Sequence, residues 1–137
     1  MRRVTFDTNV FISALNFGGN PKRLLDMAVA REVEVAISDP IIAEIERVLR
    51  VKFKWQADEV ADTLKLISSF TQRVEPKQTL DVVKSDPDDN RIVECAVESG
   101  SEAIVTHDKD LLRMKEYQGI RVVKVLDFLR EGPERGR

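Results

Sequence analysis

The sequence predicts an α/β protein in which a mostly parallel sheet is covered by helices on both faces. Two observations support this prediction. Short apolar or alternating runs typical of strands alternate along the chain with segments of helical periodicity, and the tripeptide "SDP" opens a helical segment twice, at 38–40 and 85–87. Parallel strands need long crossovers, which are usually helices. In such sheets ligands bind at the carboxyl ends of the strands.

The first half of the chain contains two clear strand patterns. Residues 4–6 alternate as a short strand, and the apolar run resumes more densely at 10–12. A helix is predicted over 21–31 and a second strand over 33–38. The next helix is expected to begin with Asp39 as its N-cap and Pro40 at its first position. Two further predictions complete this half: a helix over 56–72, and an extended stretch between Val74 and Val83.

The second half repeats the alternation. Asp86 is expected to cap a helix that ends at Gly100. The elements predicted after it are a strand in 102–108, a short helix over 109–114, a strand over 120–125 and a helix over 126–131. We therefore expect one domain over residues 1–130 and a flexible tail over 131–137.

Composition excludes several classes of protein and site. The chain has 137 residues, of which 42% are hydrophobic, and this suits one globular domain. No apolar stretch is long enough for a membrane span and no signal peptide is recognisable, so we expect a cytoplasmic protein. Cys95 and His107 are the only residues of their types and provide no zinc ligand set, so any metal would be held by oxygen. A net charge of −2 argues against coating nucleic acid through bulk positive charge.

Four acidic residues are expected near one edge of the sheet. Asp7 and Asp108 each follow a predicted buried strand. Glu44 lies at the rim of the apolar face of its helix, and Asp89 lies in line with the inward-facing Ile92. The same projection turns Asn90 away from the core and leaves Asp88 at the edge.

Each acid also has a purely structural interpretation. Asp39, Asp86 and Asp108 stand where an N-cap is wanted, and we assign the first two to capping. Asp89 would complete an arrangement like a capping box with Asp86. Taken alone, Glu44 is a surface acid that is either solvated or paired with Arg47. For the two remaining chemistry-bearing residues we expect a surface imidazole at His107 and an inert, packed thiol at Cys95.

Three blocks of the sequence resemble the PIN domain family, and more closely its VapC-like branch, the toxin components of prokaryotic toxin–antitoxin systems. The blocks are "VTFDTNVFISAL" (4–15), "SDPIIAEIERVL" (38–49) and "DPDDNRIVECAVESGSEAIVTHDKDLL" (86–112). The resemblance extends from about Arg3 to Phe128. It implies a three-layer fold with strand order 3-2-1-4-5 and a Mg²⁺- or Mn²⁺-dependent endoribonuclease. It also implies an RNA substrate, an antitoxin partner and a homodimer.

The resemblance assigns roles to individual residues. It implies that four acids are catalytic residues and metal ligands, namely Asp7, Glu44, Asp89 and Asp108. Asn9 and Ser13 match small polar residues that hold the first acid, and Thr106 belongs to the family's Thr-x-Asp pattern. Asp110 remains an alternative to Asp108 as the fourth acid.

Elementary electrostatics explains why such a cluster needs a cation. Two carboxylates ~4 Å apart at an effective dielectric of 20 repel by about 4 kcal/mol. A hard divalent ion offsets this repulsion and activates water for attack on a phosphate. The RNA backbone would meet a basic strip near Glu44, made of Arg47, Arg50, Lys52 and Lys54, although a solvated helix face explains these charges equally well. Phe17 and Trp55 are candidates for base stacking, but packing in the core or in a dimer is favoured for both.

Other enzyme and signalling classes fit less well. A haloacid-dehalogenase-like phosphotransferase requires a second Asp two residues after Asp7, where this chain has Asn9. A receiver domain requires an adjacent acidic pair after the first strand, and none is present. Two alternatives stay open: a PIN nuclease of RNA processing or quality control, and a catalytically idle PIN-like binding module.

Overall fold

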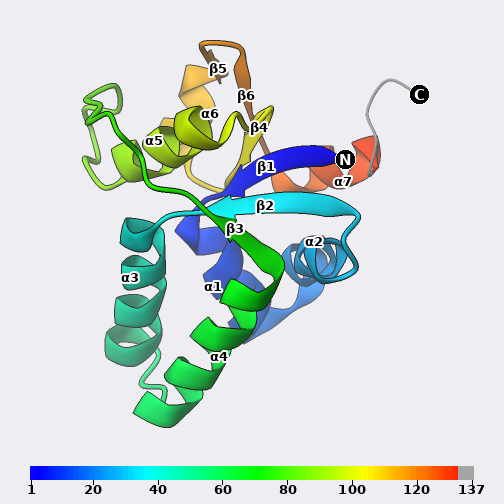
Figure 1. Ribbon diagram of the computed structural model, residues 1–137, viewed down its shortest axis with the longest axis vertical. Coiled ribbons are helices and arrows are strands. Elements are labelled where there is room, and N and C mark those ends of the chain that lie inside the picture. The colour runs from blue at the N-terminus through cyan, green and yellow to red at the C-terminus, as the bar shows by residue number, and fades with distance from the viewer. Residues whose placement is uncertain (133–137) are drawn as a thin grey trace.

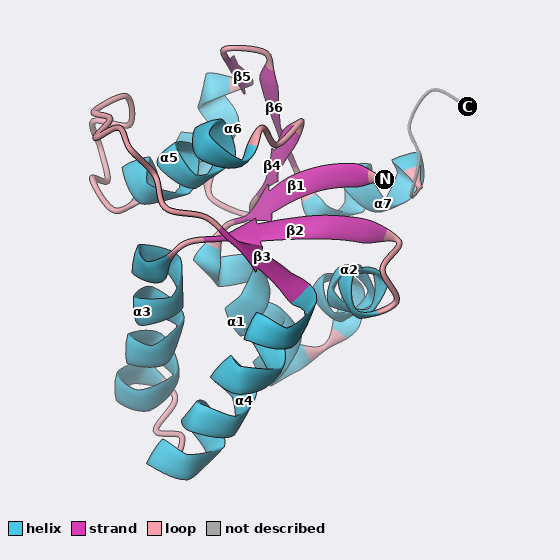
Figure 2. Cartoon of the chain, in the orientation of Figure 1, coloured by secondary structure: helices cyan, strands magenta, loops and turns pink. Residues whose placement is uncertain are grey.

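A computed structural model of the chain describes residues 1–132 and has a mainly parallel six-stranded sheet (Figures 1 and 2). The strands are β1 (Arg2–Phe6), β2 (Val33–Ile37), β3 (Thr71–Arg73), β4 (Ala103–Val105), β5 (Glu116–Tyr117) and β6 (Ile120–Val123). Their order is β3-β2-β1-β4-β6-β5, and only β5 pairs antiparallel. The expected order is confirmed, with β6 as the predicted fifth strand. The extra edge strand, β5, has two residues, which is too short for a recognisable alternation.

Helices cover both faces of the sheet and give the predicted three layers. They are α1 (Thr8–Phe17), α2 (Gly19–Val29), α3 (Asp39–Arg47), α4 (Ala57–Phe70), α5 (Asp89–Ser99), α6 (Lys109–Met114) and α7 (Val125–Glu131), and a π-helical turn, η1 (Val48–Lys52), continues α3. On one face α2 packs against α1 and α7, while α5 and α6 lie on the other (Figure 1). Within residues 1–132, no helix combines the length and the apolar character needed to cross a membrane.

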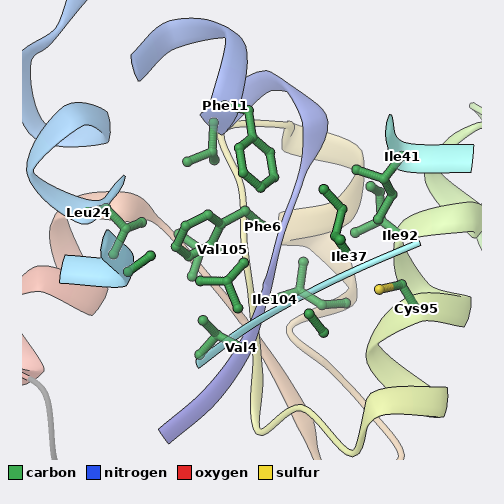
Figure 3. Packing of buried hydrophobic residues seen from close by; sticks show 14 of the residues in the cluster. Val4, Phe6, Phe11, Leu24, Ile37, Ile41, Ile92, Cys95, Ile104 and Val105 are labelled. Carbon is green, nitrogen blue, oxygen red and sulfur yellow. The ribbon is translucent and has the colours of Figure 1, made fainter. Parts of the chain in front are cut away.

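The core lies on both faces of the central strands. Phe6 on β1 packs beside Phe11 of α1, with ring centroids 5.6 Å apart, and Leu24 lies on the same side (Figure 3). Cys95 on α5 is fully buried, so its expected role as a packed thiol is confirmed. Burial of these side chains is the main stabilising contribution to the fold.

The parallel strands place the residues that follow them at one edge of the sheet. Phe6 pairs with Val105, so the residues directly after β1 and β4 are neighbours. The backbone N–H of Asp7 donates to the carbonyl of Val105 at 2.9 Å. Asp7 and Thr106 therefore emerge side by side at the carboxyl end of the sheet.

Several predicted element boundaries are wrong. A separate helix, α1, starts directly after Asp7, and α2 begins at Gly19, before Pro21. The helix predicted over 56–72 ends at Phe70, because the chain then joins the sheet as β3. The expected N-cap at Asp39 is also wrong, since Ser38 precedes the first helical residue.

The end of the chain only partly overlaps the described residues. The tail expected over 131–137 begins at Glu131, which is the last residue of α7 and accepts hydrogen bonds from Arg2 and Arg121. Residues 133–137 lie outside the described residues.

Candidate active site

Three carboxylates meet at the carboxyl end of the sheet. Asp7, Asp89 and Asp108 each offer one oxygen that lies within 4.8 Å of the others. Asp7 directly follows β1, Asp89 is the first residue of α5, and Asp108 precedes the first residue of α6. The structure thus brings together three of the four acids predicted from the sequence.

Thr106 connects two members of the cluster. Its hydroxyl donates to Oδ2 of Asp7 at 2.6 Å and accepts the backbone N–H of Asp108 at 2.8 Å. Thr106 is fully buried, which fixes the hydroxyl in this position. Asp7 stands at the N-cap position of α1 but makes no capping hydrogen bond, so its carboxylate is left directed to the cluster.

Burial and mutual repulsion disfavour the ionised forms of two of these acids. Burial raises the pKa of Asp7 from 3.8 to about 6; the hydrogen bond from Thr106 opposes this rise, and the charge of Asp108 adds to it. Burial also raises the pKa of Asp89 far above the ordinary range of an aspartate. Contact with the Asp108 carboxyl and the negative charge of Asp7 raise that pKa further.

The donor set suits a hard divalent cation. Within residues 1–132 no basic side chain is bonded to these three closely spaced carboxylates, so such an ion would relieve their repulsion. Oδ2 of Asp89 is buried and has no hydrogen-bond partner among the described residues, which is costly unless a further ligand satisfies it. The cluster can therefore hold a metal ion.

Asp108 both caps α6 and belongs to the carboxylate cluster, whereas Asp110 does neither. The Asp108 carboxylate accepts the backbone N–H of Asp110 at 3.0 Å, which caps α6, and it also belongs to the cluster. The Asp110 carboxylate instead accepts from Arg113 at 2.7 Å. The geometry therefore favours Asp108 as the acid that follows β4.

The cluster opens into a cavity of about 710 Å³, large enough for part of a nucleic acid strand. Asn9, Ser13 and Glu44 all line it. Oδ1 of Asn9 is buried without a hydrogen-bond partner in the described part of the chain. The Glu44 carboxylate lies outside the close cluster and binds Arg47 at 2.6 Å. The pairing expected for Glu44 as a surface acid is thus present, on the wall of the same cavity.

The four basic residues predicted to face RNA do not all lie in the cavity. Arg47 and Lys52 line it. Arg50 is exposed and paired with Glu46, and Lys54 is exposed outside the lining. Only half of the predicted strip therefore borders the candidate active site.

The two aromatic candidates differ in their surroundings. Trp55 packs against the core, as favoured from the sequence, and its indole N–H donates to Oδ1 of Asn16 at 3.1 Å. Phe17 lines the cavity and is 75% exposed, so core packing is wrong for it. His107 is exposed outside this cavity, as expected.

The two acids predicted to be N-caps, Asp86 before α5 and Asp39 at the start of α3, are placed differently from the prediction. Asp86 does not cap the helix itself; Oδ1 accepts the backbone N–H of Asp88 at 3.1 Å in the turn that leads into α5. Asp39 pairs with Arg73 on β3. Asp86 and Asp88 both line the cavity, although neither was predicted to belong to the site. The sequence signal for their position is the concentration of acids in "DPDD".

Asn90 was predicted to turn away from the core, which is wrong. It is 2% exposed, and its side chain accepts the backbone N–H groups of Val82 and Val83, both at 2.8 Å. It also donates to the carbonyl of Val83 at 3.1 Å. Asn90 therefore fixes the segment before α5 next to Asp89.

Chains in several solved VapBC structures share this fold. The matching chain in VapBC2 from Rickettsia felis, bound to a DNA fragment from its promoter, has 15% identity and a TM-score of 0.62 and covers 89% of this chain and 98% of its own. The matching chain in VapBC-1 from nontypeable Haemophilus influenzae has 13% identity and a TM-score of 0.64, and it covers 90% of this chain and 98% of its own. The matching chain in DNA-bound VapBC from Salmonella typhimurium has 16% identity and a TM-score of 0.61, and it covers 91% of this chain and 99% of its own.

The sequence supplies the family assignment. No curated protein matches it. The family model described as PIN domain matches residues 3–110, most of the chain, including all three clustered carboxylates. The chain belongs to the PIN domain family.

Proposed function

We propose that this protein is a metal-dependent endoribonuclease and the toxin of a toxin–antitoxin pair. One observation carries the nuclease proposal: three carboxylates, two of them buried, lie within 4.8 Å of one another at the base of an open cavity. Such a concentration of like charge destabilises the fold unless a bound cation offsets it, and acids with perturbed pKa values cluster at functional sites.

Asp7, Asp89 and Asp108 would hold Mg²⁺ or Mn²⁺, and Glu44 on α3, which lines the same cavity, would complete the acidic set. The ion would supply positive charge that activates water and offsets charge on the phosphate during hydrolysis. Thr106 keeps the Asp7 carboxylate in place through its 2.6 Å hydrogen bond. We assign Asn9 and Ser13 to support of the same acid.

The basic residues would bind the RNA backbone. Arg47 and Lys52 border the cavity, and we assign them to contact with phosphates near the cleaved bond. Arg50 and Lys54 would contribute at longer range. Because Arg47 is paired with Glu44, a substrate phosphate would have to compete with the Glu44 carboxylate for the Arg47 guanidinium.

The structural relatives support a protein partner. Besides the VapBC complexes, FitAB bound to a DNA fragment has a chain with this fold at 16% identity and a TM-score of 0.61. We infer an antitoxin as the partner, a homodimeric assembly and a cytoplasmic location. A small antitoxin-like reading frame directly upstream of the gene would support the toxin role; its absence would favour a nuclease of RNA processing or quality control.

RNA cleavage tests the nuclease proposal directly. The purified protein should cleave single-stranded RNA with Mg²⁺ or Mn²⁺, and EDTA should stop the reaction. Asp108→Asn should abolish cleavage, whereas the matched Asp110→Asn protein should retain it, because Asp110 pairs with Arg113 outside the cluster. Undiminished cleavage in excess EDTA would refute the metal mechanism.

A further inference from the structure

An exposed aromatic pair forms part of the cavity wall. Phe17, the last residue of α1, has 75% of its surface exposed. Its ring meets that of Phe53 nearly edge to face, with centroids 6.0 Å apart and an interplanar angle of 69°. Both side chains line the cavity that contains the carboxylates. An isolated exposed Phe would need no explanation, but this one belongs to the candidate active site.

One wall of the cavity leads from the carboxylates to this pair along α1. The helix begins at Thr8, directly after Asp7. Asn9, Ser13 and Phe17 are spaced four residues apart, so they share one face of the helix, and all three line the cavity. The ten residues of α1 rise about 15 Å. Phe17 is therefore at the far end of the cavity from the carboxylates.

A second part of the lining follows α3 and η1 to the same place. Glu44 and Arg47 line the cavity from α3, and Lys52 lines it from the end of η1. The next residue is Phe53, whose ring contacts Phe17. The two parts of the lining therefore converge at the aromatic pair, and the lining changes from acidic at the sheet to basic and aromatic at the far end.

An aromatic face beside a cation is the combination with which proteins bind unpaired nucleotides, since the ring stacks on a base and the cation contacts a phosphate. We propose that Phe17, supported by Phe53, stacks on an unpaired base of the RNA substrate while Lys52 contacts the adjoining backbone. This inference rests on the proposed ribonuclease function. It makes the aromatic pair a determinant of single-strand preference, because a base within a duplex has no free face to offer.

Substitutions at Phe17 separate stacking from simple apolar contact. In cleavage of a single-stranded oligoribonucleotide, Phe17→Ala and Phe17→Leu should each lower kcat/KM about tenfold, the loss expected for one stacked base, whereas Phe17→Tyr should stay within about twofold of the wild type. The matched control is Leu66→Ala, since Leu66 is 61% exposed on α4 and does not line the cavity. It should cleave at the wild-type rate.

Removal of single bases from the substrate identifies the stacked position. One abasic position near the cleaved bond should slow the wild type about tenfold and slow Phe17→Ala no further. Binding provides an independent readout, measured in the Asp89→Asn background, which is expected to be inactive. RNA with 2-aminopurine at that position should lose fluorescence on binding the Asp89→Asn protein. It should lose much less on binding the double variant that also carries Phe17→Ala.

The outcomes distinguish this inference from the function on which it rests. Wild-type cleavage with an unchanged rate in Phe17→Ala and no sensitive abasic position would overturn the stacking role and favour a polypeptide partner or a second copy of the chain at Phe17. If the wild type cleaves no RNA, the proposed function fails. The 2-aminopurine experiment then still decides whether Phe17 stacks on a bound base: quenching that is equal with and without Phe17→Ala would refute it.

Discussion

Replacement of Asp7 by Asn should stabilise the protein when metal is absent. Asn has nearly the shape of a protonated aspartic acid, and its amide oxygen can still accept the hydrogen bond from Thr106. The substitution therefore removes a buried negative charge that faces Asp89 and Asp108 without emptying its site. The proposed role of Asp7 as a metal ligand predicts this behaviour, because such a residue opposes folding when the ion is absent.

The size of the effect follows from the pKa of Asp7. A rise from 3.8 to about 6 means that the folded protein binds the proton more tightly than the unfolded chain does. Ionised Asp7 then lowers the free energy of unfolding by about 3 kcal/mol near pH 8, and by about half of that near pH 5. Stability of the wild type should accordingly rise as the pH falls from 8 toward 5, and the raised pKa of Asp89 acts in the same direction.

Denaturation in EDTA measures the difference. The Asp7→Asn protein should unfold with a free energy up to about 3 kcal/mol larger than the wild type near pH 8, or roughly 10 °C higher in Tm, and the gap should narrow near pH 5. Asp62→Asn on α4 is the control, because Asp62 is exposed and outside the cluster. It should show no such gap.

Added Mg²⁺ should reverse the order of stability of the wild type and Asp7→Asn. Mg²⁺ should stabilise the wild type by RT ln(1 + [Mg²⁺]/Kd) and stabilise Asp7→Asn much less. If the chelated Asp7→Asn protein melts below the wild type and both gain equally from Mg²⁺, Asp7 is a structural hydrogen-bonding residue and the acids do not form one site.

Four further substitutions test the cluster and its surroundings. Thr106→Val should lower the free energy of unfolding by about 1–2 kcal/mol in chemical denaturation, because it leaves the backbone N–H of Asp108 unpaired, and it should reduce cleavage. Asn90→Ala should cost about 2–4 kcal/mol in the same assay, since three backbone groups of the preceding segment lose their partner. Asp86→Ala should cost about 1 kcal/mol yet retain measurable RNA cleavage, whereas Asp89→Asn should fold and be inactive.

The clustered acids could be predicted because local rules determine their positions. Asp7 and Asp108 follow apolar strands, and parallel strands present their carboxyl ends at one edge. Asp89 shares the inward face of α5 with Ile92 and Val93, which the helical period shows directly. The burial of all three helix residues follows from this spacing.

The errors arise where a distant segment determines the environment. Projection of α5 treats the sheet as its only neighbour, but the chain before the helix folds back against Asn90 and buries it. Asp39 pairs with Arg73, which is 34 residues away and lies on a strand too short to predict in register. The 75% exposure of Phe17 likewise depends on how α1 and η1 meet, and no local pattern contains this information.

The most direct test of one metal centre compares Mn²⁺ binding with RNA cleavage in the same proteins. Titration calorimetry should detect Mn²⁺ binding to the wild type and to the control Asp110→Asn. Asp7→Asn, Asp89→Asn and Asp108→Asn should each weaken binding at least about tenfold, and their cleavage rates should fall in parallel. Wild-type Mn²⁺ affinity in all three variants, with cleavage lost, would contradict the assignment of these carboxylates as the ligands of a catalytic ion.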